Sequence, residues 1–257
     1  MGELWFVGLG LSDERGLSDR AREVLRGAGA VFAEEYTAVA PVGTFERLGR
    51  TLGRAITSLD RPLLESERPI VEALDRYGSV ALVVPGDPFA ATTHVQLRIA
   101  AERAGHRWHY VPGASILTAA IGYLGLMHYR CGRTVSLPMP APGFEPTSPL
   151  EQIAGNRSRG LHTLLLLDLA PPEGRYLTAD RALALLRERD PNGTVLPPGA
   201  PVAVAARVGR DDADGWYGPI EELSTAEFGP PMHAVVVPAP QLHFEEEAAV
   251  GHFRWPR

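Results

Sequence analysis

Short apolar runs alternate with amphipathic stretches through the first half of the chain. Residues 4–7 are apolar and end in a glycine-rich turn, and residues 79–84 form a run that is apolar throughout after Ser79. Runs of this kind are typical of parallel strands that are covered on both faces. Between them, residues 21–28 carry apolar side chains at helical spacing, and residues 44–52 read as a second short helix. This β-α alternation predicts a parallel sheet with right-handed crossovers.

Further elements in this half follow the same pattern. Strands are expected at residues 30–33, 55–59 and 108–111. Helices are expected at residues 92–104 and 116–124 and after residue 66. Serine is a favoured N-cap residue because its hydroxyl accepts a hydrogen bond from a free backbone N–H. The predicted helix caps in this half are Ser18, Ser66 and Ser115.

The second half has its own set of elements. Strands are expected at residues 134–137, 163–167, 202–206 and 234–237, and a helix capped by Thr178 at residues 179–188. Prolines 138, 140 and 142 are spaced as in a stiff linker. We therefore expect two domains, residues 1–131 and 132–257. The segment after Leu242, which contains three consecutive glutamates, is expected at the surface.

Composition excludes several classes of chemistry. The 257 residues are 45% hydrophobic, and all 25 basic residues are arginine. A chain without lysine cannot form a lysine Schiff base or use a phosphate-loop lysine. The single cysteine, Cys131, excludes internal disulfides and cysteine-based metal clusters. A net charge of −6 gives no support to nucleic-acid binding.

Targeting features are weak at the sequence level. The first residues lack the basic segment of a signal peptide, and no window approaches the length of a membrane span. We expect a cytoplasmic protein that does not associate with membranes.

Two motifs resemble known site signatures but are incomplete. The Gly8–Gly10 turn begins like a dinucleotide fingerprint, but Asp13 stands where the third glycine is needed. The Gly113-Ala114-Ser115 segment begins like a nucleophile elbow and lacks its closing glycine. An NAD site and a hydrolase site are both disfavoured, and Ser115 is better explained as a helix cap.

The histidines do not form a metal-binding pattern. The eight histidines are scattered and the HExxH motif is absent, so no metal site is expected. His94, His162 and His233 are interpreted as interior histidines with hydrogen-bond partners.

Glycine-rich turns follow the carboxyl ends of several predicted strands, where ligands bind in open α/β sheets. Glycine allows backbone N–H and C=O groups to approach a ligand closely. In Pro85-Gly86-Asp87-Pro88, the carboxylate of Asp87 can accept hydrogen bonds from hydroxyl or ammonium groups. These turns suit a polar, uncharged or cationic small molecule.

Several segments together resemble the diphthine synthase family of the tetrapyrrole methylase superfamily. The resemblance extends from Leu4 to about Glu247, in register and with matched spacing. The segments that carry it are FVGLGLSDE at residues 6–14, FAEEYT at 32–37, PGDPFAATTH at 85–94, GLHTLLLLD at 160–168, LTA at 177–179, ARVG at 206–209 and FGPPMH at 228–233.

The resemblance implies two α/β domains, with a mostly parallel N-terminal sheet and a mixed C-terminal sheet. It implies a homodimeric methyltransferase that binds S-adenosylmethionine in a cleft between the domains and releases S-adenosylhomocysteine. Its substrate would be translation elongation factor 2, on which a histidine already carries a 3-amino-3-carboxypropyl group. The amino group of that histidine adduct would receive the methyl group, on the way to diphthamide.

The family's cofactor contacts can be carried over by motif, while no catalytic residue is identified. They are Leu11, Asp87, Ala90, Ser115, Ile116, Leu167, Val208 and His233. The chain departs from the family pattern at residues 112–115 and in the proline-rich stretch 138–142, which puts the substrate-facing loop in doubt.

Other functions remain open at this point. Within the superfamily, the substrate is alternatively a tetrapyrrole precursor or ribosomal RNA, although Arg47, Arg50 and Arg54 offer RNA only a short basic stripe. Outside it, the chain is alternatively a non-catalytic binding module or an NAD-linked oxidoreductase.

Overall fold

The computed structural model describes residues 1–144 and 146–256, apart from the side chain of residue 172. Internal contacts divide the chain into two compact units, Met1–Ser115 and Ile116–Arg257. The domain border expected after residue 131 lies inside the second unit, since Cys131 forms a β-bridge with His162.

The first unit alternates strands and helices, as the sequence predicted. Its elements are β1 (Glu3–Gly10), the 3-10 turn η1 (Glu14–Gly16), α1 (Asp19–Gly27), β2 (Ala30–Glu34), α2 (Thr44–Leu52), β3 (Thr57–Leu59), α3 (Arg61–Glu65), α4 (Arg68–Tyr77), β4 (Ser79–Pro85), α5 (Val95–Arg103) and β5 (Arg107–Val111).

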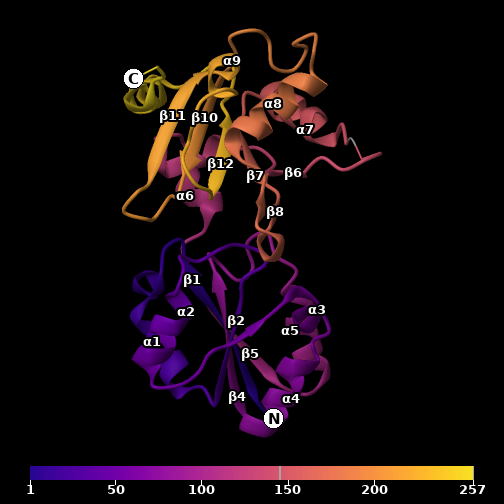
Figure 1. Cartoon of the computed structure of the whole chain (residues 1–257), viewed down its shortest axis with the longest axis vertical. Helices are drawn as coiled ribbons and strands as arrows, with labels where there is room; N and C mark the ends of the chain where they lie inside the picture. Colours follow the sequence, from indigo (N-terminus) through magenta and orange to yellow (C-terminus); the bar gives the residue numbers. More distant parts are fainter. Residues whose placement is uncertain (145, 257) are drawn as a thin grey trace. The chain divides into compact units, whose positions relative to one another are not determined.

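The first sheet is parallel throughout, with the strand order β3-β2-β4-β1-β5. Helices cover both of its faces, α1 and α2 on one and α3, α4 and α5 on the other (Figure 1). The central strand β4 is buried from Val80 onward, which explains why its sequence is apolar without alternation. All five strands end at one edge of the sheet, and the turns of interest follow these ends.

The second unit contains a mixed sheet. Its elements are α6 (Ile116–Tyr123), η2 (His128–Arg130), β6 (Val135–Leu137), α7 (Ser148–Arg157), β7 (Thr163–Leu167), β8 (Leu169–Ala170), η3 (Pro171–Glu173), β9 (Arg175–Tyr176), α8 (Ala179–Arg189), β10 (Pro201–Ala206), β11 (Asp214–Pro219), α9 (Ile220–Leu223), β12 (His233–Val237), α10 (Phe244–Val250) and η4 (Gly251–Phe253).

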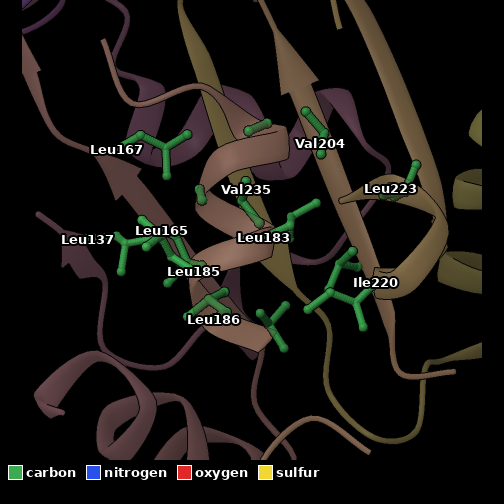
Figure 2. Packing of buried hydrophobic residues seen from close by; sticks show 14 of the residues in the cluster. Leu137, Leu165, Leu167, Leu183, Leu185, Leu186, Val204, Ile220, Leu223 and Val235 are labelled. Carbon is green, nitrogen blue, oxygen red and sulfur yellow. The ribbon is translucent and has the colours of Figure 1, made fainter. Parts of the chain in front are cut away.

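The second sheet has the order β11-β10-β12-β7-β6, in which only β6 and β7 run parallel. Helix α8 packs Leu183 and Leu186 against Val204 and Val235 of this sheet (Figure 2). The predicted combination of a mostly parallel N-terminal sheet and a mixed C-terminal sheet is confirmed. Among the described residues, no helix is both long enough and apolar enough to cross a membrane.

Several local predictions were wrong, each for a physical reason. Helix α5 begins at Val95 and not at residue 92, because Ala91 takes a left-handed conformation (φ 58°) and the loop continues to His94. Ser66 closes helix α3, and Glu67 precedes helix α4.

The C-terminal segment lies mostly at the surface, as expected, but two of its side chains are buried. The segment after Leu242 forms helix α10, in which Glu246 and Val250 are fully buried. The sequence alone gives no sign that Glu246 is buried, because most of its hydrogen-bond partners lie far away along the chain. Strand β11 was not predicted at all.

Candidate active site

Three turns meet at the carboxyl edge of the first sheet, after strands β1, β4 and β5. Gly10 and Gly86 exchange two backbone hydrogen bonds, of 3.1 and 2.7 Å, and both have positive φ angles. A Cβ on Gly113 would lie 2.2 Å from the carbonyl oxygen of Gly86, and one on Gly8 would lie 2.3 Å from the nitrogen of Gly113. Glycine is therefore required at Gly8 and Gly113 for the three turns to touch.

The carboxylate of Asp87 joins these turns. Its Oδ1 accepts a hydrogen bond from the backbone N–H of Phe89 at 3.0 Å. Its Oδ2 accepts one from the backbone N–H of Gly113 at 3.2 Å and another from the hydroxyl of Tyr110. The side chain that the sequence singled out as a ligand group is therefore also part of the local structure.

The loop after Asp87 is held by its own hydrogen bonds. The carbonyl oxygen of Pro88 accepts the hydroxyl of Thr92 at 2.6 Å and lies 2.8 Å from Nδ1 of His94. The backbone N–H of Ala90 donates to the carbonyl oxygen of Asp87 at 3.2 Å. Ala90, one of the expected cofactor contacts, is thus fixed relative to Asp87.

Four of the expected cofactor residues lie at this edge. Leu11 follows Gly10, Asp87 and Ala90 belong to the β4 loop, and Ser115 follows the Gly113 turn. Each of the four is partly exposed. Ile116 is the first residue of helix α6 and belongs to the second unit.

Three further expected residues share one edge of the second sheet. Leu167 ends β7, His233 begins β12, and Val208 lies two residues beyond the end of β10. The register pairs Ala206 with His233 and Ala234 with Leu166, so these strand ends are neighbours. The structure therefore assembles the expected residues into two sets, one in each unit.

His233 uses both of its ring nitrogens within the protein. Its Nδ1 accepts the backbone N–H of Ala179 at 3.2 Å, and its Nε2 lies 3.1 Å from the carbonyl oxygen of Pro230. These partners place the proton on Nε2 and leave the ring neutral. Burial lowers the pKa of His233, which agrees with a neutral ring. Because Thr178 makes no side-chain cap, the imidazole satisfies the first N–H of helix α8 in its place.

Arg207 holds the loops around Val208 and His233, a role that the sequence did not reveal. Its guanidinium donates to the carbonyl oxygens of Phe228 and Pro230 at 2.9 and 2.7 Å. Its backbone has a left-handed φ of 51°. The Ala-Arg-Val-Gly motif marks the segment, but the carbonyl partners of the side chain follow only from the fold.

His94 and His162 are interior residues, as predicted, with exposed fractions of 2% and 0%. His162 donates from Nε2 to Glu246 at 2.8 Å and accepts the backbone N–H of Ala239 at Nδ1 at 2.9 Å. The residues described contain no cluster of three or more His, Cys, Asp or Glu side chains that could hold a metal ion.

Comparison with known proteins assigns the family. Residues 3–224 match the model of the tetrapyrrole (corrin/porphyrin) methylases. A diphthine synthase of Methanococcus maripaludis is 36% identical over 253 residues, covering 97% of this chain and 98% of the relative. A diphthine synthase of Methanothermobacter thermautotrophicus is 38% identical over 248 residues, covering 95% of this chain and 92% of the relative.

A solved structure agrees with these sequence matches. A crystal structure of diphthine synthase superposes with a TM-score of 0.88 at 33% identity, covering 98% of this chain and 96% of that one. The similarity thus holds over both units. The chain belongs to the tetrapyrrole methylase family and, within it, to the diphthine synthases.

Proposed function

We propose that this protein transfers a methyl group from S-adenosylmethionine to the amino group of the 3-amino-3-carboxypropyl-modified histidine of translation elongation factor 2. Similarity to diphthine synthases over nearly the whole chain carries this proposal. As a member of the family, the protein is an S-adenosylmethionine-dependent methyltransferase. The reaction belongs to diphthamide biosynthesis.

The residues at the carboxyl edge of the first sheet fit such a cofactor. Two glycines with positive φ, Gly10 and Gly86, leave the turn backbone without side-chain cover. Asp87 is partly exposed and keeps free acceptor capacity on its carboxylate, which suits the hydroxyl and ammonium groups of S-adenosylmethionine. We propose that Leu11, Asp87, Ala90 and Ser115 contact the cofactor.

The second set of residues would contribute contacts of a different kind. Both ring nitrogens of His233 are engaged, so a cofactor contact by His233 would come from its backbone or from the face of its ring. Leu167 and Val208 are almost fully buried apolar residues and can offer backbone groups and apolar surface. We propose these three and Ile116 as further cofactor contacts.

Methyl transfer mainly requires that the methyl donor and the attacking amine are held in the correct relative position. S-adenosylmethionine supplies an electrophilic methyl group, and a neutral amine can attack it in line. Asp87 and the glycine turns would hold the donor, and water can accept the proton that the amine loses. We infer that the chain has no essential general base. A single Asp, Glu or His substitution that abolished turnover with unchanged cofactor affinity would contradict this inference.

Mass spectrometry tests the proposed reaction. Elongation factor 2 is isolated from a strain that lacks this protein and is incubated with the enzyme and S-adenosylmethionine. We expect added methyl groups on the peptide that carries the modified histidine, and the mass also gives their number. If labelled methyl groups instead entered ribosomal RNA or a tetrapyrrole precursor, the alternative substrate would be correct. Cofactor binding without any transfer would indicate a binding module.

Titration calorimetry tests the proposed role of Asp87. Loss of one hydrogen bond to a charged acceptor costs on the order of 1.5–3 kcal/mol, so Asp87→Ala should weaken S-adenosylmethionine binding by roughly ten- to a hundredfold. Unchanged affinity would mean that Asp87 serves only its own turn.

Assembly and location complete the proposal. We propose a homodimer, which light scattering of the purified chain would detect as twice the mass of 27.8 kDa. We also propose that the enzyme works in the cytoplasm, where its substrate takes part in translation.

A further inference from the structure

Tyr110 reaches Asp87 from the far side of strand β1. The order of the sheet places β1 between β4 and β5, and Tyr110 of β5 pairs in register with Phe6 of β1. Its ring packs on Phe89, with 5.2 Å between the centroids, and its hydroxyl donates to Oδ2 of Asp87. The contact therefore connects the β4 loop to the edge strand.

The carboxylate of Asp87 accepts three hydrogen bonds within the protein. A carboxylate offers about four acceptor positions, two on each oxygen. On Oδ2, the hydroxyl of Tyr110 and the N–H of Gly113 occupy both positions. On Oδ1, the N–H of Phe89 occupies one. One acceptor position on Oδ1 is therefore left for a ligand.

The hydroxyl of Tyr110 acts as a donor over the whole physiological range. Burial and the neighbouring Asp87 raise its pKa to about 12, so the phenol keeps its proton at neutral pH. Tyr110 as a whole residue is 42% exposed.

We propose that Tyr110 is a positioning residue for the cofactor, whose hydroxyl fixes Oδ2 of Asp87 and so directs Oδ1 toward a donor group of S-adenosylmethionine. This inference rests on the proposed role of Asp87 in cofactor binding. Without the hydroxyl, Oδ2 regains a free acceptor position and the carboxylate can turn or bind water. The bound cofactor then has to order a side chain that the intact protein holds in advance.

A purely structural role would give different results. The ring of Tyr110 packs on Phe89, and a phenylalanine would keep this packing. If packing were its whole contribution, Tyr110→Phe would leave cofactor binding unchanged.

Calorimetry on a double-mutant cycle separates the two roles. We expect Tyr110→Phe to raise the Kd for S-adenosylmethionine about three- to tenfold, the effect of one ordinary hydrogen bond, while kcat at saturation changes little. In an Asp87→Ala background, which leaves no acceptor for the hydroxyl, the same substitution should have no further effect, because it acts through Asp87. Tyr77→Phe is the matched control, because Tyr77 is 47% exposed and its hydroxyl has no partner among the described residues.

A spectroscopic titration checks the contact without using activity. With ring-labelled tyrosine, NMR should show Tyr110 titrating near pH 12, and Asp87→Asn should move its pKa back toward the ordinary value of 10.0. Thermal unfolding of each variant confirms that it is folded.

The outcomes distinguish this inference from the proposed function. If Asp87→Ala weakens binding and Tyr110→Phe does not, the inference is wrong and the role of Asp87 stands. If Asp87→Ala leaves the affinity unchanged, the cofactor contact itself is wrong. Additive effects of Tyr110→Phe and Asp87→Ala would also overturn the inference, because they would show that Tyr110 acts independently of Asp87.

Discussion

Removal of the carboxylate of Glu246 should strongly destabilise the second unit. Glu246 is completely buried and accepts four hydrogen bonds. The donors are the backbone N–H groups of Met127 and His243, each at 2.9 Å, Nε2 of His162 at 2.8 Å, and the guanidinium of Arg130. One side chain thus connects helix α10 to the segment after helix α6 and to the residue that precedes β7.

The magnitude follows from the groups left behind. In Glu246→Ala, the ring of His162 and the N–H of Met127 lose their acceptor in a buried site, and Arg130 loses its ion-pair partner. Removal of one partner of a buried ion pair costs about 3–5 kcal/mol. For a chain of this size, each kcal/mol lowers the Tm by about 2–4 °C. We therefore expect the Tm to fall by roughly 6–20 °C.

Calorimetric or circular-dichroism melts would measure this change. Glu247→Ala is the matched control, since Glu247 is exposed on the same turn of helix α10 and its removal changes the net charge equally. Glu246→Gln keeps the shape of the side chain and should give an intermediate loss. If the free energy of unfolding of Glu246→Ala were within about 0.5 kcal/mol of that of the parent, as for a surface substitution, the buried network would contribute nothing and the reasoning would be refuted.

The remaining predictions concern pH, close packing and thiol reactivity. Burial lowers the pKa of His162 and of His233 in the folded protein below the ordinary 6.5. The stability that their neutral forms contribute is therefore complete above pH 6.5 and is lost as the pH falls below it. Urea titrations between about pH 7 and pH 5 should show this decline in the free energy of unfolding, and a flat profile would contradict it. Gly113→Ala should lower the Tm sharply, because its Cβ would lie 2.2 Å from the carbonyl oxygen of Gly86. In the control Gly122→Ala, inside helix α6, the new Cβ meets nothing within 4 Å, and the substitution should stabilise the protein by about 0.5–1 kcal/mol. Burial raises the pKa of Cys131 to about 11, so alkylation at pH 7 should be slow in the folded protein and fast after unfolding, and equal rates would contradict this.

Local sequence signals were sufficient for much of the fold. Helix α2 at Thr44–Leu52 and strand β7 at Thr163–Leu167 have the boundaries that the pattern predicts, because apolar periodicity and caps are local properties. Strand β11 was missed because Asp214–Pro219 contains two glycines and a proline, residues that disfavour strands unless neighbouring strands supply the pairing.

The site was less accessible to such reasoning. The turn at Asp87 could be identified from its prolines and its place after an apolar strand. The partners that hold it could not, since Tyr110 lies 23 residues away and meets Asp87 only across β1. In the same way, the sequence places Glu246 at the surface with its neighbouring glutamates. Its buried partner, His162, lies 84 residues away and cannot be identified from the sequence. Pairings of this kind depend on the tertiary fold and leave no periodic signal in the sequence.

The loop that follows Asp87 has a consequence for the thermodynamics of ligand capture. The hydrogen bonds that Phe89, Ala90, Thr92 and His94 donate all have acceptors within the loop itself. A ligand that binds to this loop restricts few further backbone torsions. The entropic cost of binding should therefore come mostly from the ligand's own loss of conformational, translational and rotational freedom. Affinity at this edge of the sheet then depends mainly on the interactions that the ligand forms with a loop whose conformation is fixed by folding.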